Sequence, residues 1–277
     1  MHLSVKCFFL LSFIYIIGCH ATPSGEREIV TPDAPTATEP GYDTTQKNVH
    51  VLVALCDNKY QGIVPVPAKI GNGQDPDNNL YWGCGYGVRT YFKKSSHWTF
   101  IKSIKRDGIK MQRLVFKHKR KNSYLIADAY NGMYIKDCTV DFFQSCSGRL
   151  KDVLDINGKR IGINGNASLI AYIGHDGLMD FNLNESFQNT DGKKRDAIIL
   201  ACISKKYFTP YLSQTQARPL VWSTGLMSPE AYTLHDALNA YLSNQSPEAM
   251  RSAAAKAYAK YQKCSEKAAR NLLVTGF

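Results

Sequence analysis

The sequence predicts an α/β fold, a three-layer sandwich built on a mostly parallel β-sheet. Short apolar runs rich in β-branched residues recur along the chain, and stretches with helical spacing of apolar residues separate or follow them. Several runs are apolar at successive positions, which is typical of strands buried on both faces. The chain has 277 residues, of which 44% are hydrophobic and 21% charged, the balance of a soluble globular protein. Strands that alternate with helices favour a sheet covered by helices on both sides.

The strands are predicted in order from six apolar segments. The first, NVHVLVALCDN, opens the domain at residue 49, and the others are HWTFIKSI, SYLIADAY, SLIAYIG, AIILAC and RPLVWST. The basic run KHKRK, residues 117–121, lies between the apolar segments MQRLVF and SYLIADAY. A solvated hairpin tip is the interpretation we favour for this run, because no nucleic-acid-binding motif accompanies it.

Helices are predicted between and after these strands. Residues 75–95 predict a helix entered near Asp77, because apolar side chains recur there at steps of three and four. Residues 135–148 predict a second helix closed by Gly148.

Two further helices are predicted at the C-terminus, each beginning with the motif SPE, at Ser228 and at Ser246. In this motif serine caps the helix, proline takes its first position, and glutamate meets the positive helix end.

The N-terminus predicts a targeting segment and a tether. Residues 1–18 contain the short apolar run CFFLLSFIYII, which fits the hydrophobic region of a secretory signal peptide. The motif IIGC then resembles the bacterial lipobox, which would make Cys19 a lipidated residue; the alternative is ordinary cleavage after Ala21. Residues 19–48 are rich in Thr, Pro and acidic residues and predict a disordered tether. Residues 49–277 are then one α/β domain.

Charge and cysteine spacing narrow the classes of function. The net charge of +11 favours acidic partners or anionic surfaces. No Cys-x-x-Cys pair or Cys/His spacing suggests a metal site, and structural disulfides are permitted outside the cytoplasm. Cys138 and Cys146 are expected on one helix, too far apart to bond each other. Neither a GxSxG elbow nor a phosphate-binding loop is present.

The candidate catalytic residues follow two neighbouring apolar runs. The strand in SLIAYIG ends at Gly174 and His175, and the strand in AIILAC ends at Cys202. Ligand sites gather at the carboxyl ends of parallel strands, so these side chains can meet at one edge. Histidine can act as the base for a cysteine nucleophile, and such a pair predicts a thiol partly ionised near neutral pH. Gly174 and Gly177 would let the backbone turn sharply and approach a substrate.

The order strand, histidine, strand, Ala-Cys resembles the caspase-like cysteine peptidases, a group that includes caspases, legumain, clostripain and gingipains. The resemblance rests on YIGHDG and ILACIS, with HVLVALCDN as a fitting first strand, and covers residues 49 to about 225. It implies a caspase-like fold, His175 as the base and Cys202 as the nucleophile. The family usually has glycine after the histidine, and its amide helps to bind the oxyanion. Asp176 takes that place here.

Two polar, aromatic segments are candidate substrate walls. One follows the first strand, and the other follows the strand in RPLVWST, so both are expected at the carboxyl edge of the sheet. Amides and aromatic rings together suit the recognition of a peptide or a sugar, although the first segment could also be an ordered surface loop held by Asx turns. The candidates are Asp57, Asn58, Asn79, Tyr81 and Trp82 in the first segment and Trp222, Ser223 and Thr224 in the second.

Two acidic residues are alternative candidates near the pair. Asp128, which ends SYLIAD, and Asp176 could orient the base or bind a basic substrate side chain. The sequence as a whole predicts a cysteine peptidase or transpeptidase of the bacterial cell envelope, acting on a peptide or protein substrate without a cofactor or metal. It would be membrane-anchored through its N-terminal lipid, facing the periplasm from the outer membrane. The alternative is a caspase-like protein without catalytic activity that binds an envelope peptide or glycan.

Overall fold

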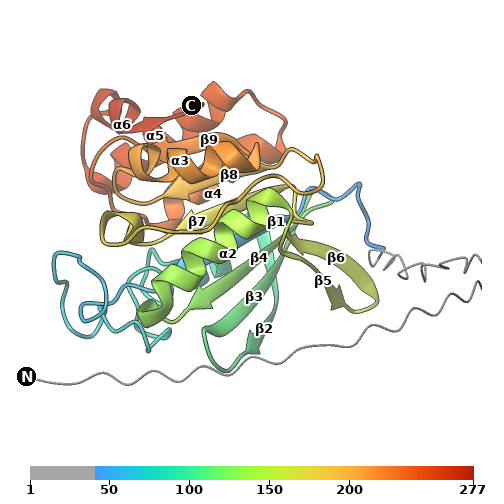
Figure 1. Ribbon diagram of the computed structural model, residues 1–277, viewed down its shortest axis with the longest axis horizontal. Coiled ribbons are helices and arrows are strands. Elements are labelled where there is room, and N and C mark those ends of the chain that lie inside the picture. Colours follow the sequence, from blue (N-terminus) through green and yellow to red (C-terminus); the bar gives the residue numbers. More distant parts are fainter. Residues whose placement is uncertain (1–40) are drawn as a thin grey trace, which may run out of the picture. The chain divides into compact units, whose positions relative to one another are not determined.

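The computed structural model describes residues 41–277, which form one compact unit (Figure 1). The predicted signal peptide, the lipidation site at Cys19 and most of the predicted tether lie outside the described residues. The packing begins before residue 49, because the side chains of Gln46 and Asn48 are buried. Asn48 accepts a hydrogen bond from the Tyr124 amide, so the end of the predicted tether is part of the domain.

An eight-stranded sheet forms the middle of the domain. Its five central strands are parallel, and an antiparallel strand or pair extends each edge, so the predicted mostly parallel sheet is confirmed. The strands in spatial order are β10 (Leu273–Val274), β9 (Arg218–Ser223), β8 (Asp196–Leu200), β7 (Leu169–Ile173), β1 (Val49–Ala54), β4 (Tyr124–Tyr130), β3 (Lys110–His118) and β2 (Trp98–Lys105).

Helices cover both faces of the sheet, which gives the predicted three layers. On one face lie α1 (Val88–Lys93), α4 (Ala231–Leu242) and α5 (Pro247–Gln262), followed by α6 (Glu266–Leu272). On the other face lie α2 (Ile135–Ser147) and α3 (Ser204–Thr215); α2 crosses the sheet in Figure 1.

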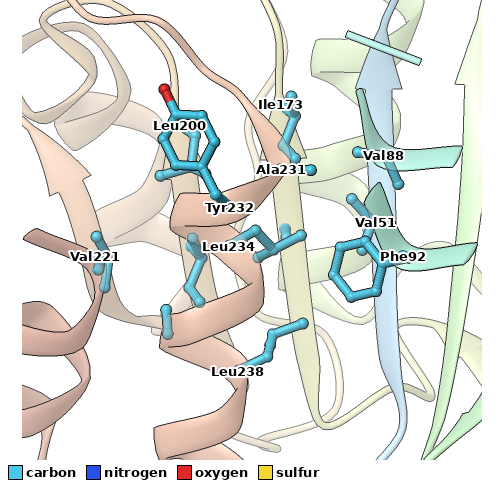
Figure 2. Close-up of a cluster of buried hydrophobic side chains, with 14 of the residues drawn as sticks. Val51, Val88, Phe92, Ile173, Leu200, Val221, Ala231, Tyr232, Leu234 and Leu238 are labelled. Atoms are coloured by element: carbon cyan, nitrogen blue, oxygen red, sulfur yellow. The ribbon is translucent and has the colours of Figure 1, made fainter. Parts of the chain in front are cut away.

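The side chains of β1 show how the core is divided. Val49, Val51 and Val53 pack in the cluster with α1, α4 and α5, whereas Leu52 and Ala54 pack in the cluster with α2 and α3. Successive side chains of a strand point to opposite faces, so one fully apolar strand serves both cores. Figure 2 shows side chains of α1 and α4 gathered over strand residues from β1 to β9.

Three smaller elements complete the domain. The hairpin of β5 (Lys151–Ile156) and β6 (Lys159–Asn164) covers the outer part of the sheet, and Ile161 and Ile163 pack there with Val115 and Ile126. Two short 3-10 turns, η1 (Gly132–Tyr134) and η2 (Gly177–Met179), follow β4 and β7. None of the helices in residues 41–277 combines the length and the hydropathy that a membrane crossing requires.

The helix predicted from Asp77 begins only at Val88, so that prediction is wrong for its first part. Polar side chains close the preceding residues into turns, because Asp75 accepts from the amides of Asp77 and Asn78, and Asn79 accepts from that of Tyr81. Such local side-chain bonds compete with helix formation.

Four other predictions can be compared directly. The motif at Ser228 precedes a helix that begins at Ala231, with Glu230 as its N-cap. Ser246, by contrast, caps α5 as predicted, and its hydroxyl accepts the Ala249 amide. Gly148 ends α2 with φ of 78°, a conformation that favours glycine. The basic run begins inside β3, at Lys117 and His118, and its remaining residues turn the chain into β4, as predicted for a hairpin tip.

Candidate active site

His175 and Cys202 come to the same edge of the sheet because β7 and β8 pair in parallel. Ile173 and Leu200, the last residues of these strands, stand opposite each other, and each candidate lies two residues further on. The Gly174 amide donates to the Leu200 carbonyl at 3.2 Å. The two strands are therefore neighbours, which is the condition under which the two side chains were expected to meet. The adjacent strand β1 pairs with β7 on one side and β4 on the other, which is the switch point where ligands bind in such sheets.

Both side chains line one cavity of about 510 Å³ at this edge. Its lining comes from the strand ends and from three loops: residues 62–66 after β1, residues 80–81 before α1, and residues 226–230 after β9. This volume lies in the range of small-molecule and peptide-binding sites. The structure thus places a cysteine, a histidine and an enclosed space together.

Cys202 is partly buried and lies against the backbone of Met227. The Met227 amide donates to Sγ at 3.3 Å, and the thiol lies 3.4 Å from the Met227 carbonyl. Burial raises the pKa of the Cys202 thiol, the nearby charge of Asp176 raises it further, and the Met227 amide opposes them. Desolvation therefore works against the partly ionised thiol that the sequence predicts near neutral pH.

The residue after Cys202 has an unusual backbone. Ile203 has φ of 50°, and its amide donates to Gly225 at 2.8 Å. A β-branched residue at positive φ costs on the order of 1–3 kcal/mol, and such strain gathers at functional sites. Helix α3 begins at the next residue, Ser204, whose hydroxyl bonds the Ser223 amide at 3.0 Å. The sharp turn presents Cys202 at the positive end of a 12-residue helix, which favours a thiolate there.

The His175 ring is held by Asp180. His175 is 8% exposed, and its Nε2 lies 2.7 Å from Asp180 Oδ2. The same carboxylate oxygen accepts the Gly62 amide at 3.3 Å. A Cβ at Gly62 would come within 2.6 Å of Asp180 Oδ1, so the contact needs glycine. On the other side, the Tyr172 hydroxyl donates to the His175 carbonyl at 2.8 Å.

Sequence reasoning did not single out Asp180. Its only signal was an acidic residue five positions after the histidine, in GHDGLMD. The two meet because η2 turns the chain back on itself between them. Residues 62–66 and 226–230, which line the cavity, lie within the two predicted walls, but none of them was singled out; one stretch contains the exposed Val64 and the other the exposed Leu226.

Asp176 is buried beneath the turn. Its Oδ1 accepts the Leu178 amide at 3.0 Å, while Oδ2 is buried without a hydrogen-bond partner within residues 41–277. Burial raises the pKa of Asp176 to about 7, so the group titrates near neutrality. The backbone amides of Asp176 and Cys202 donate no hydrogen bond within that same range.

The two glycines of the turn serve close packing. A Cβ at Gly174 would lie 2.9 Å from Ala54 Cβ, and one at Gly177 would lie 2.6 Å from the Phe181 ring. Larger residues would push the turn away from β1 and from the residues that follow it. Gly174 also lines the cavity beside His175.

Of the candidate residues in the first predicted substrate wall, one lines the cavity and the others hold the loop or fill the core. Tyr81 lines the cavity and packs in the same core cluster as the buried Cys56. Asn79 is fully buried and bonds the amide and the carbonyl of Cys56.

The other three candidates of this wall hold the loop. Asp57 is buried and accepts the amides of Lys59 and Tyr60, whereas Asn58 bonds the backbone of Val66 through both ends of its amide. Trp82 is fully buried in the core.

Trp222, Ser223 and Thr224, which head the second predicted wall, do not line the cavity, whereas residues 226–230 further along the same segment do. Trp222 is buried against α3, and its Nε1 donates to the Gly276 carbonyl at 3.0 Å. Ser223 is buried and bonds the Ala201 carbonyl and Ser204. Thr224 is exposed, and its hydroxyl donates to the carbonyl of Asn271 at 2.9 Å.

Asp128 lies inside the sheet. It is fully buried, it accepts two hydrogen bonds of 2.6 Å from Arg113, and its Oδ2 lies 3.1 Å from His50 Nε2. Arg113 and His50 hold the pKa of Asp128 well below its usual range. Burial lowers the pKa of His50, and the Asn164 amide donates to His50 Nδ1. This carboxylate therefore joins strands β1, β3 and β4.

Neither a metal site nor a similar protein helps to assign the site. Within the described residues, no group of three or more His, Cys, Asp and Glu side chains could hold a metal ion. Comparison of the chain with protein-family models, with curated proteins and with solved structures finds no match. The class that the fold and the site define is an α/β protein with a cysteine–histidine cavity at the carboxyl edge of its sheet.

Proposed function

We propose that this protein is a cysteine-dependent peptidase or transpeptidase of the caspase-like kind. The observation that carries the proposal is the shared cavity of His175 and Cys202 at the carboxyl edge of two paired strands. The strained turn at Ile203 and the contact of His175 with Asp180 support it, since a nucleophile needs presentation and its base needs orientation.

The proposed reaction begins with a proton transfer. Donation of Nε2–H to Asp180 leaves Nδ1 as the basic nitrogen of His175. Nδ1 takes the thiol proton of Cys202 as Sγ attacks the carbonyl carbon of the substrate. The amides of Asp176 and Cys202 donate to the oxyanion that forms.

The second half of the reaction releases the products. The C–N bond of the tetrahedral intermediate breaks, and the leaving amine takes the proton from the imidazolium. Water then attacks the thioester with His175 as the base, which releases the acid and restores the thiol. If an amine attacks in place of water, the outcome is transpeptidation.

A second candidate is a binding protein for an envelope peptide or glycan that uses the same cavity without chemistry. Two observations favour it: burial raises the pKa of the Cys202 thiol, and Asp176 stands where the caspase-like group has glycine. In that case Tyr81 in the cavity wall carries recognition, because buried aromatic side chains often dominate binding energy.

For location, we propose attachment to the envelope through a lipid on Cys19, on the strength of the IIGC motif. Mass spectrometry of the membrane fraction should find the acylated residue in the wild type, and Cys19→Ala should release the protein. Membrane partition without lipid in the wild type would contradict the anchor.

A fluorogenic peptide library, offered to the wild type and to three variants, tests the function. Cys202→Ala and His175→Ala should each abolish cleavage, and their losses should not add, because a nucleophile and its base act as a unit. Cys264→Ala is the matched control, since that thiol is exposed at the end of α5 and should keep full activity. Turnover that persists in Cys202→Ala would refute the assignment of Cys202 as the nucleophile. If the wild type cuts no peptide, the second candidate, a binding protein without activity, is the one that remains.

A further inference from the structure

The walls of the cavity carry information about the substrate. Apolar side chains supply most of its lining, and they come from chain segments far apart in the sequence: Ile63, Val64 and Val66 after β1, Leu80 before α1, and Leu226 and Met227 after β9. Neither lysine nor arginine is among the lining residues.

Two of these side chains are unusually exposed. Val64 is 87% exposed and Leu226 is 72% exposed. Among the other exposed large apolar side chains in residues 41–277, Phe277 is 58% exposed and the rest are 37% to 47% exposed. They belong to different loops of the same cavity, with Met179 beside them at 39%. Apolar surface exposed around a cavity marks a binding site, because a ligand that covers it removes it from water.

Glu230, the carboxylate that lines the cavity, and Asp180, the carboxylate that holds the lining residue His175, already have partners. The Asp180 carboxylate bonds His175 and the Gly62 amide. Glu230 Oε2 accepts the Tyr232 hydroxyl at 2.8 Å and the Gln262 amide at 3.1 Å. Burial raises the pKa of Glu230, so its charged form, which would attract a cationic ligand, is disfavoured.

We infer that the cavity binds an uncharged, apolar side chain of a peptide, and that the preferred substrates carry such a residue at the bond that is cut. This inference rests on the proposed function for the position of the bond, while the binding preference stands without it. A volume of about 510 Å³ admits a side chain as large as that of leucine or phenylalanine together with part of its peptide. A basic side chain read by Glu230 is the competing outcome.

Binding to Cys202→Ala measures the preference without cleavage. Fluorescein-labelled tetrapeptides that differ at one position (Leu, Phe, Lys, Arg, Asp or Glu) should bind with dissociation constants at least tenfold lower for Leu and Phe than for the charged residues. In the wild type, kcat/KM for peptidyl aminocoumarins with the same residues before the scissile bond should follow the same order.

Two rim variants locate the preference. Leu226→Asp and Val64→Asp, each made in Cys202→Ala, should weaken the leucine peptide about tenfold. Ile101→Asp is the matched control, because that side chain is exposed on edge strand β2 and does not line the cavity. The control should leave binding unchanged.

Each result decides one of the two proposals. Stronger binding of Lys or Arg peptides that Glu230→Gln abolishes would overturn the inference, and so would equal binding of every class or no binding at all. If apolar peptides bind as expected but the wild type cuts none of them, the peptidase proposal fails and the apolar site remains.

Discussion

Asp180 Oδ2 lies 2.7 Å from His175 Nε2 and, at 3.3 Å, also accepts the amide of Gly62. One carboxylate thus holds both the proposed base and the loop that forms a wall of the cavity. Residue 180 belongs to the same turn as the base, whereas Gly62 comes from the loop after β1, so the contact joins two strand ends of the sheet.

Asp180→Asn should lower kcat about ten- to a hundredfold and change KM little, because the ring loses its orienting acceptor while the cavity walls stay. Steady-state kinetics on the best fluorogenic peptide measure this split. Asp107→Asn, at an exposed carboxylate away from the site, is the control. A rise in KM with kcat unchanged would show that Asp180 holds only the loop.

Alkylation of Cys202 by iodoacetamide should be slow at pH 7 and should accelerate continuously beyond pH 9. Burial and the charge of Asp176 raise the pKa of this thiol, and only the thiolate reacts. Mass spectrometry after timed quenching follows each cysteine, with the exposed Cys264 as internal reference. Asp176→Asn should speed the reaction. Fast labelling at pH 7 would mean that His175 already holds the proton.

Asp176→Asn should stabilise the protein more at pH 8 than at pH 5. The pKa of Asp176 is about 7 in the folded protein and 3.8 for the free side chain, so the folded state binds more protons. Its contribution is complete below pH 3.8 and is lost as the pH rises through 7. The difference in unfolding free energy at pH 8 should be on the order of a few kcal/mol. Urea unfolding at both pH values measures it.

Acidification from pH 7 to pH 5 should destabilise the domain through His50. Burial lowers the pKa of His50 below 6.5, so the folded state resists a proton that the unfolded chain accepts. The stability is complete above pH 6.5 and is lost as the pH falls, at up to about 1.4 kcal/mol per pH unit.

The variant His50→Gln separates the effect of His50 on the pH dependence of stability from the effect of Asp176. The two effects have opposite signs between pH 5 and pH 7. Glutamine can still donate to Asp128 but does not titrate. Its unfolding free energy should depend less on pH between 7 and 5 than that of the wild type, measured in urea. An unchanged slope would assign the acid sensitivity elsewhere.

The parallel strands were predictable because their residues are apolar on both faces, and that pattern has few alternatives. The presence of His175 and Cys202 at one edge depended on the pairing of β7 with β8, which the order of the strands along the chain favours but does not fix. The turns before α1 were not predictable from periodicity, because Tyr81, Val88 and Phe92 keep helical spacing while Asp75 and Asn79 bind the backbone first.

The individual residues that line the cavity could not be predicted from residue type. Asn79 and Trp82 resemble recognition residues in the sequence, but one satisfies buried backbone groups and the other fills the core. Val64 and Leu226 resemble ordinary loop residues, and only their places on two loops of one cavity single them out. Asp180 gains its role through the η2 turn, which the sequence pattern does not encode.

The six cysteines from Cys56 onward are all free thiols, and Cys138 and Cys146 lie on one helix as predicted. Within residues 41–277 the fold is therefore held by packing, hydrogen bonds and ion pairs, without a disulfide. Reductant should leave its refolding yield unchanged. Air oxidation during storage should act first on Cys264, because it is the exposed thiol among the six. The expected product is a disulfide between the Cys264 residues of two molecules, which leaves each fold intact.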